Sequence, residues 1–337
     1  MSVIRGSVRL AQRFSSTPTP LLWASSSSRT GLHCSLRQPP QSRTITLASE
    51  WIAADDSVDD DSDVFVFLHG LLGNRRNLHT LAKTLCGRVG RRGLLLDIRG
   101  HGASQITDKS GTTPTTLSDC ANDVYETLQP YAEDLEQVRW TLVGHSLGGR
   151  ISMLYALQQA QHKVPLPLLP QNIWLLDTVP GALDASVRHV VSVAHKLENS
   201  LEPLPKTRSA LVEALTRDEG MSLGVAQWLA SSFTLETRSF SFDLKIAQEI
   251  MADFDEVQFM EWIKAEPVPV DLVRGGANKA WESAAGHVEE LEDWHEEAER
   301  EFRIHTLKDA GHWVHMDDMP GLVNIIENVQ RELDSRT

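Results

Sequence analysis

Short apolar runs, bounded by glycine, proline or polar residues, recur along the chain and alternate with longer segments of helical periodicity. The runs predict seven strands, at residues 44–48, 64–68, 93–97, 138–143, 173–177, 268–274 and 302–307. The helical repeat predicts helices in most intervals, notably at 78–85, 118–131, 149–159 and 322–332. Strands that alternate with helices are typical of a mostly parallel α/β sheet with helices on both faces. Active sites on such sheets lie at the carboxyl ends of the strands.

The alternation stops between residues 181 and 264, where four segments have helical periodicity and no strand is predicted. These segments are 182–201, 206–217, 223–231 and 242–264. We expect them to form an inserted helical lid whose apolar stripes pack against each other. The predicted organisation is a leader at 1–43, a first part of the core at 44–180, the lid at 181–264 and a second part of the core at 265–337.

The first 49 residues contain six arginines, many serines and threonines, and no acidic residue before Glu50. Such a segment resembles an organelle transit peptide. Arg5, Arg9 and Arg13 are four residues apart and would share one face of a short helix, which favours a mitochondrial address, with the matrix as destination. The serine run at 25–28 keeps a plastid address open, and a disordered tail without an address is the other alternative.

The rest of the chain is strongly acidic. Six of the 32 basic residues and none of the 46 acidic residues precede Glu50, so residues 50–337 carry a net charge of −20. This argues against a nucleic-acid partner, because phosphate binding relies on clustered Lys and Arg. No stretch approaches the roughly 20 apolar residues of a membrane-spanning helix. Cys34, Cys86 and Cys120 have neither a paired framework nor metal-ligand spacing, so we expect no metal site and no cofactor.

A serine flanked by glycines follows the fourth predicted strand. Residues 144–149 are Gly-His-Ser-Leu-Gly-Gly, the pattern of a nucleophile elbow, in which a sharp strand-to-helix turn exposes the serine. Glycines at 144 and 148 leave room for the close approach that the turn requires. Short glycine patterns also occur in packing turns and phosphate loops, so Ser146 needs partners elsewhere in the chain.

The loop after the strand at 64–68 supplies one partner. It reads His-Gly-Leu-Leu-Gly and predicts half of an oxyanion hole, with the backbone N–H groups of Leu71 and Leu147 as the two donors. Backbone donors allow apolar side chains at both positions. Other polar side chains near these loops are expected to shape them rather than to do chemistry: His69, Asp97, Arg99, His101 and His145.

The base is expected from the segment 309–315, Asp-Ala-Gly-His-Trp-Val-His, which follows the last predicted strand. We predict His312 as the general base toward Ser146 and then as the general acid toward the leaving group, with His315 as the alternative.

The acid is harder to place, because the strand at 268–274 is followed by a loop without a carboxylate. Asn278 in that loop could hydrogen-bond an imidazole but could not stabilise imidazolium with a charge. We therefore predict Asp177, at the end of the strand before the lid, as the group that orients His312. The alternatives are Asp243, Asp253, Asp255 and a lid glutamate.

Together these motifs resemble the α/β-hydrolase superfamily, and more closely the abhydrolase domain-containing 11 family of mitochondrial proteins, small bacterial esterases and yeast-type ethanol acetyltransferases. The resemblance covers about residues 44–332. It implies the α/β-hydrolase fold, the triad of Ser146, Asp177 and His312, and hydrolysis of esters or thioesters of modest acyl length. The chain departs from the family in a proline-rich insertion at 163–170 and in the absence of a serine at 276–279.

Three functions are compatible with these patterns. The first is a serine hydrolase that cleaves small-molecule short- to medium-chain esters or thioesters through an acyl-enzyme at Ser146. The second is an acyltransferase that moves an acyl group from acyl-CoA to an alcohol such as ethanol. The third is a non-catalytic module that binds a ligand or a protein, because fold alone does not establish activity. Dehalogenase and epoxide-hydrolase chemistry would need an aspartate where this chain has Ser146.

Overall fold

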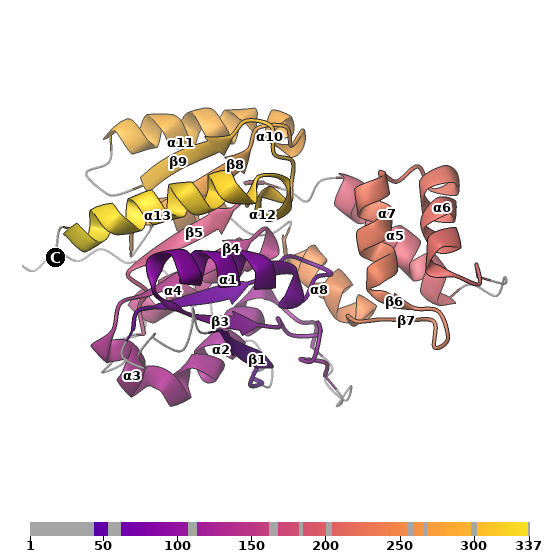
Figure 1. The fold of residues 1–337 in the computed structure, drawn as a ribbon, viewed down its shortest axis with the longest axis horizontal. Helices are drawn as coiled ribbons and strands as arrows, with labels where there is room; N and C mark the ends of the chain where they lie inside the picture. The colour runs from indigo at the N-terminus through magenta and orange to yellow at the C-terminus, as the bar shows by residue number, and fades with distance from the viewer. Residues whose placement is uncertain are drawn as a thin grey trace, which may run out of the picture. The chain divides into compact units, whose positions relative to one another are not determined.

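The computed structural model describes residues 44–52, 62–106, 113–161, 168–181, 185–199, 204–254, 259–265, 268–297 and 302–335, so the predicted leader lies outside the described residues. A seven-stranded sheet, in the order β1-β3-β2-β4-β5-β8-β9, organises them (Figure 1). The strands are β1 (Ser49–Ile52), β2 (Val64–Leu68), β3 (Arg92–Leu96), β4 (Trp140–His145), β5 (Asn172–Leu176), β8 (Val270–Gly275) and β9 (Phe302–Leu307). β1 pairs with β3 antiparallel, and the other neighbouring pairs in this sheet are parallel. The mostly parallel α/β architecture is thus confirmed.

The prediction of a strand at 44–48 is wrong. Those residues have no regular secondary structure, and β1 begins only at Ser49. Their backbone N–H groups bond side chains instead of a neighbouring strand: Ile45 donates to Asp123, Leu47 to Thr127 Oγ1 and Ala48 to Ser104 Oγ. An apolar run can thus be extended without joining a sheet when side chains satisfy its backbone. The other six predicted strands lie within two residues of an observed strand.

Helices cover both faces of the sheet. Along β2, Val64, Val66 and Leu68 pack against one apolar cluster, whereas Phe65 and Phe67 pack against another, because alternate side chains point to opposite faces. The first cluster includes α2 (Leu117–Leu128), α4 (Leu147–Gln161) and α11 (Ala285–Glu297). The second includes α1 (Arg76–Val89) and α13 (Met319–Ser335), which lie side by side over the sheet (Figure 1). Shorter helical segments are η1 (Gln129–Tyr131), α3 (Ala132–Gln137), α10 (Ala280–Ser283) and α12 (Val314–Asp317).

The described residues between 185 and 264 form a helical insertion between β5 and β8. Its elements are α5 (Ala185–Asn199), α6 (Arg208–Asp218), α7 (Leu223–Ser231), β6 (Phe233–Thr234), β7 (Ser239–Phe240), α8 (Leu244–Phe254) and α9 (Phe259–Lys264). The prediction that no strand interrupts these helices is wrong, because β6 and β7 form a two-stranded hairpin. Phe233 and Phe240 pair across the hairpin with ring centroids 4.7 Å apart. Each strand has only two residues, too few to show the alternation of a strand in the sequence. Its helices and hairpin share an apolar cluster, in which Leu72 of the loop after β2 also packs.

Candidate active site

Ser146 lies in a tight turn between β4 and α4. Its φ of 53° is in the left-handed region that residues other than glycine seldom adopt. Its N–H donates to the Leu176 carbonyl at 2.9 Å, which fixes the turn against β5. A Cβ on Gly148 would lie 2.2 Å from the Leu68 carbonyl oxygen, and one on Gly144 would lie 2.4 Å from the Gly148 carbonyl carbon. Both positions therefore require glycine, and the turn leaves Ser146 half-buried at the carboxyl ends of the strands.

The predicted oxyanion loop lies against this turn. A Cβ on Gly70 would be 3.4 Å from Ser146 Cβ and 2.9 Å from His145 Nδ1, so the loop backbone passes directly beside the serine. Leu71 continues this loop, and Leu147 is the first residue of α4. Within the part of the chain that the structure describes, neither N–H group donates a hydrogen bond to the protein. Both N–H groups thus lack a protein acceptor in the described ranges, which is a requirement for donors of an oxyanion hole.

Two buried imidazoles, of His69 and His101, connect the predicted oxyanion loop at residues 69–73 to the segment after β3. The Ile98 N–H donates to His69 Nε2 at 2.9 Å, and the Leu72 N–H donates to His101 Nε2 at 3.1 Å. Each Nδ1 lies within 2.9 Å of a backbone carbonyl, so we assign both rings as neutral with the proton on Nδ1. Burial lowers the pKa of His69 to about 3 and also lowers the pKa of His101, which agrees with neutral rings. Leu72 has a φ of 59°, and His101 holds this strained residue next to Leu71.

The structure brings Asp177 and His312 together. His312 Nδ1–H donates to Asp177 Oδ2 at 2.7 Å, although the two residues come from loops after β5 and β9. Three further donors reach the same carboxylate: the Gly275 N–H at 2.8 Å, Asn278 Nδ2 at 2.5 Å and Trp281 Nε1 at 2.7 Å. The Asp177 side chain is fully buried, and these four hydrogen bonds offset the free-energy cost of removing a carboxylate from water.

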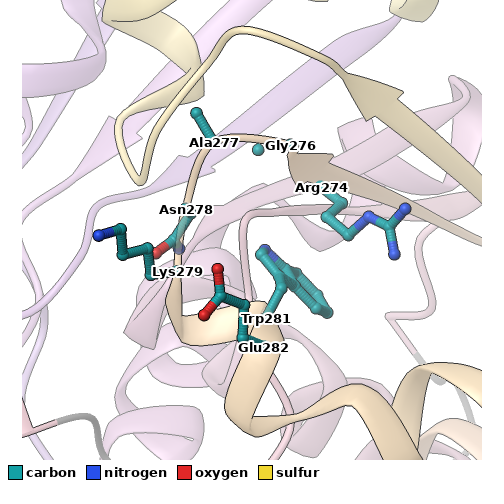
Figure 2. Close-up of a pocket in the computed structure, with 8 residues that line it drawn as sticks. Arg274, Gly276, Ala277, Asn278, Lys279, Trp281 and Glu282 are labelled. Carbon is teal, nitrogen blue, oxygen red and sulfur yellow. The ribbon is translucent and has the colours of Figure 1, made fainter.

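Sequence reasoning missed the role of Asn278 and Trp281. Asn278, considered above as a partner for the imidazole, instead holds the carboxylate that holds the imidazole. Asn278 and Trp281 also line a cavity of about 240 Å³, whose other lining residues are 274–277, Lys279 and Glu282 (Figure 2). Ser146 and His312 do not line this cavity, so we do not identify it as the substrate site. Neither residue stands in a sequence motif that indicates this role, and both are about 100 positions from Asp177 in the sequence.

The other candidate acids are engaged elsewhere. Asp243 accepts from the N–H groups of Lys245 and Ile246 at the start of α8. Asp253 accepts from the Leu117 N–H at the start of α2, at 2.6 Å. Glu249, a glutamate of the insertion, accepts from the N–H of Thr115. Asp255 lies outside the described residues.

The alternative base, His315, is buried, and no hydrogen bond among the described residues joins it to the Asp177 carboxylate. Its ring packs edge-on against that of His145, with centroids 4.7 Å apart, and burial lowers its pKa to about 4. His312 lies on another side of His145, with ring centroids 4.8 Å apart, and its side chain is 35% exposed. Among the described residues, no hydrogen bond joins Ser146 Oγ to His312. Such nucleophile–base contacts are often long until a substrate binds.

Acid is expected to destabilise the protein through its buried neutral imidazoles. The pKa values of His69 and His315, about 3 and about 4 in the folded state, lie below the usual 6.5. Between these folded-state pKa values and pH 6.5, the unfolded chain therefore binds more protons than the folded protein. The free energy of unfolding falls as pH drops below 6.5. At pH 5 each of these two histidines lowers the free energy of unfolding by about 2 kcal/mol relative to neutral pH.

Thermal unfolding of wild type and His315→Gln between pH 7.5 and 5 measures this effect. The wild-type melting temperature should fall more steeply than that of the variant, because the variant lacks one of the imidazoles. Parallel curves would contradict the assignment of His315 as a buried neutral group.

Cys86 and Cys120 are buried free thiols, and burial raises the pKa of both. The structured ranges contain no group of three His, Cys, Asp or Glu side chains arranged to hold a metal ion. None of the helices in these ranges is both long and apolar enough to cross a membrane.

Comparison with known proteins defines the class. Residues 65–324 match the model of the alpha/beta hydrolase family, so the chain belongs to that family. Within it, the chain is 29% identical over 269 residues to the sn-1-specific diacylglycerol lipase ABHD11 of Xenopus laevis, covering 78% of each chain. It is 30% identical over 265 residues to the protein of that name from Danio rerio, covering 76% of this chain and 75% of the relative. The resemblance inferred from the motifs is thus confirmed.

Solved structures agree with this fold. A marine microorganism esterase superimposes with a TM-score of 0.61 and 18% sequence identity, over 84% of this chain and 98% of that one. A thioesterase domain from the curacin biosynthetic pathway superimposes with a TM-score of 0.53 and the same identity. At these identities the likeness shows the fold alone. With the family and the curated relatives, the chain is a hydrolase of the esterase or lipase type.

Proposed function

We propose that the protein is a serine hydrolase that cleaves carboxylic esters or thioesters through an acyl-enzyme at Ser146. One observation carries the proposal: Asp177 and His312 form a 2.7 Å hydrogen bond at the strand ends where the strained serine turn also lies. A nucleophile, an imidazole and a buried carboxylate in such an arrangement are the parts that acyl transfer requires.

The residues of the site have distinct roles in this mechanism. Ser146 Oγ attacks the acyl carbonyl while His312 Nε2 takes its proton, because Nδ1 is already committed to Asp177. The N–H groups of Leu71 and Leu147 receive the oxyanion. The tetrahedral intermediate then expels the alcohol or thiol, which takes the proton from His312. Water, activated by the same imidazole, releases the acid and restores Ser146.

Acyl chemistry and the names of the relatives support a proposal for the substrate class. The relatives in Xenopus laevis and Danio rerio are named as sn-1-specific diacylglycerol lipases, and a shorter match in Serratia proteamaculans is a 2-succinyl-6-hydroxy-2,4-cyclohexadiene-1-carboxylate synthase. We propose short- to medium-chain acyl esters, including glycerol esters, with thioesters as the second group. In this proposal residues 181–264 act as a lid over the site, and residues 1–43 direct the protein to the mitochondrion.

A fluorophosphonate probe tests the nucleophile. Wild-type protein should be labelled covalently and Ser146→Ala should not, because the probe captures only an activated serine. Equal absence of labelling in both proteins would favour the non-catalytic binding module.

A substrate panel then tests the reaction. Short and medium acyl esters, a diacylglycerol and acyl-CoA should release free acid, with or without ethanol. An ester product that forms only when ethanol is present would favour the acyltransferase instead, because an alcohol would then replace water in the second step.

A further inference from the structure

We propose that His145 is a positioning residue. Its hydrogen bond to the main chain of His312 sets the distance between the turn at Ser146 (the nucleophile turn) and the loop after β9 that carries His312 (the base loop). This inference rests on the proposed function. His145 is the last residue of β4, immediately before Ser146, and it is 4% exposed. Its Nε2 lies 2.9 Å from the carbonyl oxygen of His312, a residue 167 positions further along the chain.

The chemistry of this contact fixes the state of the ring. A carbonyl oxygen only accepts, so Nε2 must carry the proton that is donated to His312. Burial and the neighbouring imidazoles of His315 and His312 lower the pKa of His145 well below its usual value, so the ring is neutral and Nδ1 has no proton. Nδ1 faces Gly70, where a Cβ would come within 2.9 Å. The ring therefore offers one donor, aimed at one carbonyl.

Three segments meet at this ring. The oxyanion loop passes it at Gly70, the nucleophile is its chain neighbour, and the base loop accepts its hydrogen bond. The side chain of His312 is held from a different direction by Asp177, so the base is tethered at its main chain and at its imidazole. The rings of His312 and His315 both pack against His145, at centroid distances of 4.8 and 4.7 Å. These contacts limit how far the base loop can move from Ser146.

A positioning role predicts an effect on turnover rather than on binding. His145 does not take part in proton transfer, because its one proton is bonded to a carbonyl and its other nitrogen faces Gly70. Loss of the donor would let the base loop move, and a displacement of about 1 Å between reacting groups can reduce the rate by about 100-fold. KM should change little, because His145 is 4% exposed and therefore offers almost no surface to a bound substrate.

The test compares three substitutions of His145. The amide nitrogen of His145→Gln reaches about as far as the imidazole Nε2, that of His145→Asn is one bond shorter, and His145→Phe keeps a ring without a donor. We expect His145→Gln to retain kcat within about threefold, and the other two to lose about 30-fold in kcat with KM unchanged. The Nδ1 proton signal of His312 in the NMR spectrum of ¹⁵N-histidine-labelled protein should persist in His145→Gln and shift or broaden in the other two.

Defined outcomes overturn the inference. If His145→Asn matches His145→Gln in kcat and in the His312 proton signal, the reach of the donor is irrelevant. If His145→Phe keeps wild-type kcat, the ring acts by its bulk and the donor is irrelevant. If His145→Gln is as impaired as His145→Phe, a donor with the reach of Nε2 does not preserve the role of the ring. If the wild type neither hydrolyses esters nor reacts with the probe, the proposed function fails, and the proton signal alone then decides whether His145 positions His312. The Gln and Asn variants keep the comparison valid if His145→Phe does not fold.

Discussion

Replacing His312 with alanine should lower the rate of ester hydrolysis by about a million-fold, the loss typical when one member of a catalytic triad that acts as a unit is removed. His312 is half-exposed beside the serine turn and carries a hydrogen bond to a buried carboxylate, so in the proposed mechanism it is the imidazole that accepts the Ser146 proton. Without it, Ser146 keeps its proton at neutral pH and only the oxyanion donors still assist the reaction.

His315→Gln provides the matched control. His315 is buried behind His145, and no hydrogen bond among the described residues connects it to Asp177, so its loss should leave kcat within about tenfold of wild type. Initial rates with a chromogenic acyl ester measure both variants. If the two variants exchanged their effects, so that His312→Ala stayed active and His315→Gln did not, His315 would be the base.

The local parts of this site could be predicted from sequence because their geometry is set by neighbouring residues. Gly144 and Gly148 surround Ser146 within five positions, and the steric contacts that require them arise from the turn itself and the adjacent strand. Six of the seven strands in the sheet were also predictable, since each is an apolar run closed by turn residues. These strands run parallel, so the loops after β4, β5 and β9 lie at the same end of the strands.

The parts that escaped prediction depend on contacts between distant segments. Trp281 donates to a carboxylate 104 residues earlier, and neither a tryptophan nor an asparagine in a loop carries a pattern that indicates such a partner. The segment 44–48 was mistaken for a strand because its hydrogen-bond partners are side chains of later elements. The small hairpin of the insertion has only two residues in each strand, so no alternation can develop.

Replacing Asp177 with asparagine should lower kcat by about 10⁴-fold. Asp177 accepts four hydrogen bonds, whereas an amide accepts on its oxygen and donates on its nitrogen. If the amide oxygen keeps the donors Gly275 and Trp281, its NH₂ group faces His312 and stabilises the tautomer with the proton on Nε2. That tautomer cannot take the proton of Ser146, so the variant should fold and bind substrate but turn over slowly.

Trp281→Phe distinguishes this effect from a general loosening of the loop. It removes one of the four donors to Asp177 but leaves the carboxylate and its contact with His312 in place, so kcat should fall by less than about tenfold. Both variants are compared by kcat and by melting temperature, since loss of a buried hydrogen bond lowers the free energy of unfolding by about 1–3 kcal/mol in either. Near-wild-type turnover of Asp177→Asn would show that the imidazole does not depend on a carboxylate here. A large loss of kcat in Asp177→Asn with a small loss in Trp281→Phe would instead show that two properties of Asp177 determine the reactivity of Ser146. These are its charge and the tautomer that it imposes on His312, rather than the rigidity of its loop.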